Sequence, residues 1–218
     1  MNLTNNKPLF THSKYTPCQE IFQAVCDELG KYYEKRSFKY SRSRPKITYS
    51  DNVLKLEISF WSSRSNTPGE WVLLEILPAF YSKQIAKMSK TKGFLFGHTG
   101  LFYHKYSADP KQIKVKHIFG EEEERIDQDS TESLIINSNA CNIYGLDEYK
   151  FRKLTEFINT QIIGWIDKLK VSEGILEFIS HPSQTRIWAL DSQHGNSEFV
   201  AYVKLNFPNI EIEKVLYQ

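Results

Sequence analysis

The side chains best suited to chemistry in this sequence are the cations and aromatic rings between Lys31 and Lys46. Lysine or arginine recurs every few positions there, with tyrosine and phenylalanine in between. Cations pair with phosphates and rings stack on bases, so the mixture is typical of proteins that bind RNA or single-stranded nucleic acid. The candidate binding residues are Arg36, Lys39, Tyr40, Arg42 and Arg44. We favour a simpler interpretation, in which these side chains cover a helix end and the solvated face of a strand.

A second group of candidates follows in a segment rich in serine, asparagine, proline and glycine. Arg64 and Asn66 lie there between Trp61 and Trp71, and a cation near large rings suits a planar or anionic ligand. The same composition is what an ordinary exposed turn requires. We therefore name Arg64, Asn66 and Trp71 as candidate binding residues and favour an exposed loop with tryptophans packed beneath it.

Residue spacing gives little support to catalysis. His98 and His104 are six residues apart, which on an unbroken strand is about 20 Å and too far for one metal ion. Asp129 precedes Glu148–Lys150 as an acid precedes Glu-x-Lys in metal-dependent nucleases, but this tripeptide falls at the start of an expected helix. Neither a glycine-rich phosphate loop nor a serine nucleophile elbow is present. We expect no catalytic residue, no cofactor and no metal site.

Charge is distributed unevenly along the chain. Up to Ile118 there are nineteen lysines and arginines against nine aspartates and glutamates, and from Phe119 onward there are nine against seventeen. The formal net charge of +2 therefore conceals a basic first half and an acidic second half. Either the halves pack together and neutralise each other, which we favour, or the basic segment forms an exposed patch for an anionic partner.

Composition predicts one globular domain in the cytoplasm. The 218 residues are 40% hydrophobic and 25% charged, and no stretch approaches the roughly 20 apolar residues that cross a bilayer. The first ten residues lack the basic and apolar regions of a signal peptide. Cys18 and Cys26 are eight residues apart on an expected helix, about 12 Å, which is beyond disulfide reach. We interpret these two and Cys141 as small hydrophobic side chains.

Apolar spacing predicts two long helices. One covers residues 17–35, with Thr16 and Gln19 as a capping box and an apolar face that recurs every three or four residues. Gly30 is expected to weaken its last turn. The other covers residues 146–169, with acids at its start and lysines at its end.

Alternating apolar residues predict several strands. The strongest is 53–62, which is expected to form a hairpin with 71–77, a strand that ends at Pro78. A short helix is expected in 81–92 and another in 172–179. Further strands are expected in 94–106, 112–119, 134–137, 187–190 and 199–207.

These elements predict an α+β fold with a mostly antiparallel sheet and two long helices packed on one face. We expect one domain over residues 1–218, with a flexible leader at 1–15 and an exposed acidic loop at 120–133. The expected core residues are Leu56, Ile58, Phe60, Leu74, Ile76, Ile158, Ile162 and Trp165.

The function expected from the sequence is binding or interaction, with a protein as the possible partner and no membrane contact. A nucleic-acid-binding protein or a metal-dependent nuclease is the alternative, and we do not favour nucleic acid as the partner.

Overall fold

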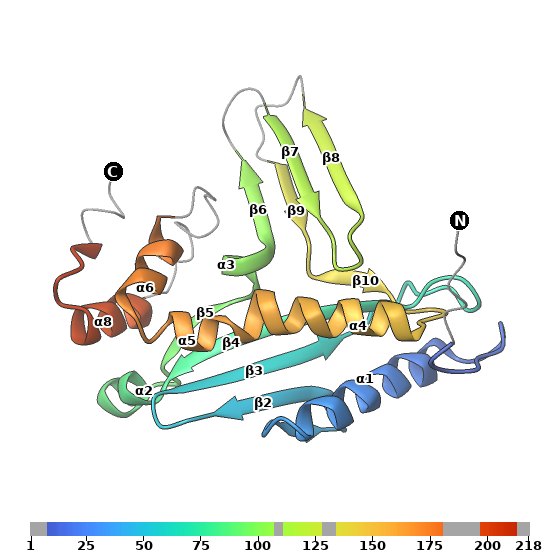
Figure 1. Cartoon of the computed structure of the whole chain (residues 1–218), viewed down its shortest axis with the longest axis horizontal. Coiled ribbons are helices and arrows are strands. Elements are labelled where there is room, and N and C mark those ends of the chain that lie inside the picture. The colour runs from blue at the N-terminus through green and yellow to red at the C-terminus, as the bar shows by residue number, and fades with distance from the viewer. Residues whose placement is uncertain (1–7, 107–110, 128–133, 181–196, 213–218) are drawn as a thin grey trace.

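The computed structural model describes residues 8–106, 111–127, 134–180 and 197–212, and its centre is one antiparallel sheet (Figure 1). The strands follow the order β1-β2-β3-β4-β10, and β5 also pairs with β4. The bounds are β1 (Lys39–Ser41), β2 (Lys46–Ser50), β3 (Leu54–Trp61), β4 (Leu73–Ser82), β5 (Phe94–Gly97) and β10 (Ala140–Asn142). The expected hairpin of β3 and β4 is present.

One face of the sheet is buried because every second residue of β3 and β4 is apolar. Leu54, Leu56, Ile58 and Phe60 are buried in β3, whereas the residues between them are partly exposed. Strand β4 does not end at Pro78 as predicted. Its first residues pair with β10 and its residues from 79 onward pair with β5. Pro78 lies where the neighbour changes, so its missing N–H is tolerated there.

Two long helical segments cover the buried face (Figure 1), which confirms the predicted architecture. The first is α1 (Cys18–Glu34). The second runs through α4 (Glu148–Phe157), a π-helical turn η1 (Ile158–Ile163) and α5 (Trp165–Lys168). The Tyr33 hydroxyl joins the two by donating to the Thr155 carbonyl at 3.3 Å and to Asn159 Oδ1 at 3.1 Å. All eight residues expected in the core are buried.

The start of α1 differs from the prediction. Pro17 is the N-cap and no side chain caps the helix. The Thr16 hydroxyl instead accepts a hydrogen bond from the Ser13 backbone at 3.0 Å, which closes a turn before the helix. The leader is also anchored, because the Leu9 N–H donates to the Leu146 carbonyl at 3.1 Å. Residues 1–7 lie outside the described part of the chain.

Gly30 has a packing role in α1 rather than a fraying one. It is buried, and a Cβ placed on it would lie 2.5 Å from the Tyr40 ring. Only glycine allows the ring to approach the helix backbone this closely.

Two ribbons project from the sheet (Figure 1). Helix α3 (His98–Phe102) leads into β6 (Tyr103–Tyr106), which pairs with β9 (Leu134–Asn137). Strand β7 (Lys111–Lys116) pairs with β8 (Glu122–Asp127). The expected loop at 120–133 was therefore wrong for residues 122–127, and 128–133 lie outside the described residues. In this antiparallel pair Lys111 is in register with Asp127, Lys114 with Glu124 and Lys116 with Glu122.

Three shorter helices complete the described chain, namely α2 (Lys83–Ser89), α6 (Ser172–Ile179) and α8 (Ser197–Asn206). The first two were expected, but a strand was predicted where α8 lies. Phe199, Tyr202 and Val203 are buried, and their spacing of three and one fits a helix face better than alternation does. The Tyr202 hydroxyl donates to the Leu169 carbonyl at 2.8 Å. The predicted strand 187–190 lies outside the described residues.

Within the described ranges, the helices are all too short or too polar to cross a membrane.

Candidate functional site

The cations of the basic segment are largely engaged within the molecule. The Arg36 guanidinium lies 3.7 Å from the centroid of the Tyr32 ring and donates to the Tyr32 carbonyl at 2.9 Å. Arg42 Nε contacts both carboxylate oxygens of Asp27 on α1, at 3.1 and 3.0 Å. Lys39 and Arg44 are exposed. Two of the four candidate cations therefore have contacts that a ligand would have to replace.

Tyr40 belongs to the same polar cluster. Its hydroxyl donates to Asp27 at 2.9 Å and accepts from Gln23 at 3.2 Å. Burial raises the pKa of Tyr40. Burial also opposes ionisation of Asp27, but hydrogen bonds from Gln23, Tyr40 and Arg42 outweigh it and lower the Asp27 pKa. This cluster holds β1 against α1. Tyr40 therefore has a packing role rather than a role in stacking on a ligand.

The second group of candidates lies in the connection between β3 and β4. Both polar groups of the Asn66 side chain are hydrogen-bonded: the amide nitrogen donates to the Ser62 hydroxyl at 2.8 Å, and the amide oxygen accepts from the Leu73 N–H at 2.9 Å. Arg64 is exposed, and the Trp71 side chain is 46% exposed. Asn66 therefore shapes the loop, while Arg64 and Trp71 remain open to a ligand.

The structure brings part of both groups to one end of the sheet. Antiparallel pairing of β2 with β3 places Pro45 beside Phe60, whose N–H donates to the Pro45 carbonyl at 2.9 Å. Arg44 precedes this contact and Trp61 follows it, so the turn before β2 and the connection after β3 are neighbours. We call Arg44, Trp61, Arg64 and Trp71 the sheet-end cluster.

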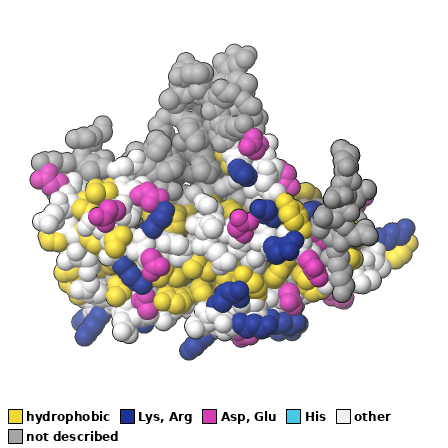
Figure 2. Space-filling model, in the orientation of Figure 1, with side chains coloured by type: hydrophobic (Ala, Val, Ile, Leu, Met, Phe, Trp, Pro, Cys, Tyr) yellow, Lys and Arg dark blue, Asp and Glu magenta, His cyan; other side chains and the backbone are white. Residues whose placement is uncertain are grey.

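The ion pairs do not follow the favoured interpretation of the charge asymmetry. Among described residues, the basic segment pairs with acids of its own half: Lys31 with Glu28, Arg42 with Asp27, and Lys46 with Glu57. Only Lys170 with Asp51 joins the two halves there. Figure 2 shows basic and acidic side chains interspersed on the face that it draws. Among these ion pairs, neutralisation is therefore mostly local.

Metal ligands are not gathered in the described part of the chain. No group of three or more histidine, cysteine, aspartate or glutamate side chains there could hold an ion. Glu148–Lys150 forms the first turn of α4, as predicted, and Asp129 lies outside the described residues. Burial raises the thiol pKa of Cys26 and Cys141. These two thiols suit the packing role expected for them.

A groove that the sequence did not reveal runs between the second long helix and the residues that connect β7 to β8. Its volume is about 910 Å³. One wall carries Tyr149, Lys153, Thr160 and Gln161, and the other carries Lys116 and Phe119. We call this the α4 groove. Phe102 and Phe157 also line it, with their ring centroids 5.2 Å apart.

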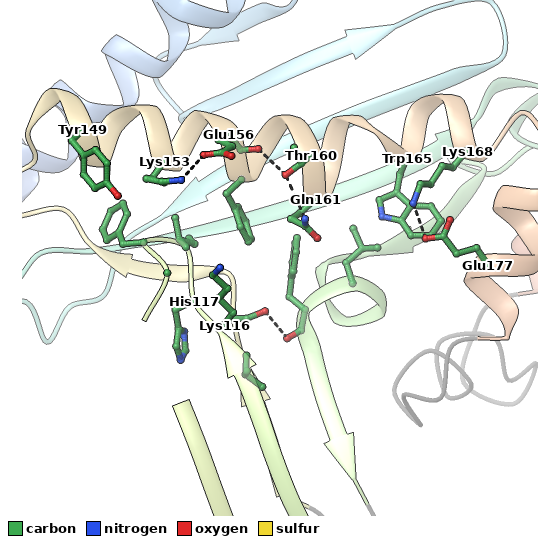
Figure 3. A pocket seen from close by; sticks show the side chains of 18 residues that line it. Lys116, His117, Tyr149, Lys153, Glu156, Thr160, Gln161, Trp165, Lys168 and Glu177 are labelled. Atoms are coloured by element: carbon green, nitrogen blue, oxygen red, sulfur yellow. Dashed lines mark hydrogen bonds and ion pairs between the residues drawn. The ribbon is translucent and has the colours of Figure 1, made fainter. Parts of the chain in front are cut away.

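Charged pairs lie along the helical wall of the α4 groove (Figure 3). Lys153 pairs with Glu156 at 2.9 Å, and Lys168 pairs with Glu177 of α6 at 2.6 Å. Lys116 extends toward the helix from the opposite wall, whereas the His117 ring points away from it. The hydrogen bond to Glu156 raises the pKa of Lys153. The groove therefore offers both charges beside an apolar surface.

The π-helical turn presents two polar side chains to the groove. The Gly164 N–H donates to the Asn159 carbonyl at 3.0 Å, a five-residue spacing that defines the turn. Thr160 and Gln161 are exposed there, whereas Ile158 and Ile162 remain buried. The run Asn159-Thr160-Gln161 is the one signal that could have drawn attention to this site, because threonine and asparagine are poor helix formers inside a long apolar pattern.

The α4 groove and the sheet-end cluster are thus the two surfaces whose side chains could recognise a ligand. The first has volume and both charges, and the second has exposed cations and rings. No protein-family model, curated protein or solved structure matches this chain.

Proposed function

We propose that this protein is a binding protein without catalytic activity and that its ligand occupies the α4 groove. The observation that carries the proposal is a groove of about 910 Å³ with apolar rings and several convergent polar side chains. Ligand sites in proteins commonly have volumes of about 300–1,000 Å³. The lining of this groove is more polar than is usual for such sites, so we expect a polar ligand.

The π-helical turn supports the same site. Such turns are rare and often occur at functional positions, because they cost stability and place side chains where a regular helix would not. Here the turn places Thr160 and Gln161 on the groove wall.

We also infer a cytoplasmic location, which the free cysteines Cys18, Cys26 and Cys141 support, because free thiols are typical of reducing compartments.

The test is a ligand screen read by amide chemical shifts. The intact protein is mixed in turn with pools of small metabolites, short peptides and oligonucleotides, and we expect one pool to shift Gln161 and Gly120. A Gln161→Trp variant should abolish these shifts, because the indole fills the groove from an exposed helix position. A matched Gln84→Trp variant on α2, also exposed, should keep them. Shifts that cluster at the sheet end, or none from any pool, would refute the proposal.

Nucleic-acid binding at the sheet-end cluster is a second candidate function. The observation that favours it is the exposure of Arg44 and Arg64 in the connections before β2 and after β3, together with Trp61 and Trp71, whose side chains are 48% and 46% exposed. Rings and cations together bind single strands. Arg42 is not part of this candidate, since it is committed to Asp27.

The second candidate is tested by the salt dependence of oligonucleotide binding. Each phosphate neutralised on a single strand contributes about 0.7 to the slope of log affinity against log salt. Replacing Arg44 and Arg64 by alanine should reduce that slope by about 1.4, whereas a Lys83→Ala and Lys87→Ala control on α2 should not. No measurable affinity in the unmodified protein would eliminate this candidate.

A further inference from the structure

The α4 groove is long and narrow rather than compact. Its helical wall extends from Tyr149 to Lys168, nineteen residue steps, or roughly 28 Å at 1.5 Å per residue. An extended peptide advances about 3.3 Å per residue, so about eight residues would span this wall. A compact metabolite would leave most of the groove unfilled.

The charges of the groove favour a peptide over a nucleic acid. Glu156 and Glu177 line it together with Lys116, Lys153 and Lys168, and carboxylates on the wall would repel a chain of phosphates. The lysines exceed the glutamates by one, so the complementary ligand carries a net negative charge. The two ion pairs are solvated, with side chains 39–60% exposed. Such pairs stabilise the fold by only about 0–1 kcal/mol, and a ligand can open them at little cost.

Gln161 adds a group that matches a peptide backbone. A glutamine amide offers both a donor and an acceptor, as a peptide unit does. Gln161 is exposed on the groove wall, and its amide makes a long 3.4 Å contact with the Thr160 hydroxyl. A contact of that length is easily exchanged for a ligand bond. The Phe157 ring, which is partly exposed and lies over the buried Phe102, supplies an apolar surface for a neighbouring side chain.

We infer that the α4 groove binds an extended segment of about eight residues from a partner protein, with an acidic side chain between Lys116 and Lys153 and an apolar one on Phe157. The inference rests on the proposed function and specifies the ligand class. Lys116 and Lys153 come from opposite walls, and Lys116 extends toward the helix that carries Lys153.

The test is selection of a displayed library of random twelve-residue peptides on the intact protein. We expect the selected peptides to share an acidic residue next to an apolar one. Synthetic peptides from this selection should bind three- to fivefold more weakly to Lys116→Ala, the loss expected for one exposed ion pair. Replacing the acidic residue of the peptide by its amide should cause the same loss in the unmodified protein and little further loss in Lys116→Ala.

A Lys87→Ala variant is the matched control, because Lys87 is an exposed lysine of α2 outside the groove. It should bind the selected peptides like the unmodified protein. The inference is overturned if no selected peptide depends on Lys116, or if Lys116→Ala and the peptide amide weaken binding independently. If metabolites or oligonucleotides shift Gln161 while no peptide binds, the groove is still a ligand site and only the peptide assignment fails.

Discussion

Asp51 is the residue whose replacement tests most directly how the second long helix is fastened to the sheet. It lies in the turn between β2 and β3, where one carboxylate oxygen accepts from the N–H groups of Val53 and Leu54 at 2.8 and 2.7 Å. The other oxygen pairs with Lys170, just beyond α5, at 2.8 Å. Burial opposes ionisation of Asp51, but these hydrogen bonds outweigh it and lower its pKa from 3.8 to about 2.

The lowered pKa gives both the size and the pH dependence of the effect. A shift from 3.8 to about 2 corresponds to about 2.4 kcal/mol. The Asp51 side chain is 22% exposed, and screening by water reduces this to about 1–2 kcal/mol. The folded-state pKa is the lower one, so the unfolded chain binds more protons at acidic pH. The contribution is therefore complete above about pH 5, about half lost at pH 3, and absent well below pH 2.

Urea unfolding of the protein and of Asp51→Asn between pH 3 and pH 7 measures this contribution. Asparagine keeps an acceptor for the two N–H groups but loses the charge, so we expect the variant to be about 1–2 kcal/mol less stable at pH 7. The difference should fall by about half at pH 3. Lys170→Met should remove the same ion pair, and adding it to Asp51→Asn should cost little more. A difference that stays constant with pH would refute this account of the turn.

Three other predictions concern packing and local geometry. Ile162 is fully buried within the π-helical turn, so Ile162→Ala should lower the free energy of unfolding by about 2–5 kcal/mol. Leu176→Ala is the control, because the Leu176 side chain is 44% exposed. Equal losses of stability for the two variants in urea unfolding would contradict the packing. Ser37 has a φ of 67° just after α1 ends. Ser37→Gly should raise the thermal midpoint, because glycine adopts this geometry without strain and the folded state gains about 0.5–1 kcal/mol of stability. A lower midpoint would show that the serine side chain is needed. Cys18 is partly exposed whereas Cys26 and Cys141 are buried, so a thiol reagent at pH 8 should label one cysteine rapidly in the folded protein and all three in guanidinium, and rapid labelling of two would mean that the core opens readily.

Elements whose side chains repeat at short range could be predicted from the order of residues alone. Helix α1 and strand β3 were predicted to within a residue or two, because their apolar positions recur at the period of the element that they form. The eight expected core residues were buried for the same reason. The α+β class followed from the order of these elements, since short connections between strands favour antiparallel pairing.

Features that depend on a partner distant in the sequence became visible only in the folded protein. Strand β8 pairs with β7 along residues 122–127, and an isolated run of like charges gives no sign of that register. The sequence suggested that Arg42 was available to a ligand, but in the fold it forms an ion pair with Asp27 of α1. Helix α8 was mistaken for a strand because every second residue from 199 to 207 is apolar, whereas the residues that the fold buries follow a helix face.

The α4 groove also depends on residues that are distant in the sequence. Its walls come from segments about forty residues apart, and its polar centre depends on a π-helical turn inside a helix that the apolar pattern predicted as regular. Apolar periodicity records which face of a helix is buried, and Ile158 and Ile162 keep that face through the turn. The opposite wall is contributed by residues 115–120, and no local pattern of residues encodes its distance from the helix.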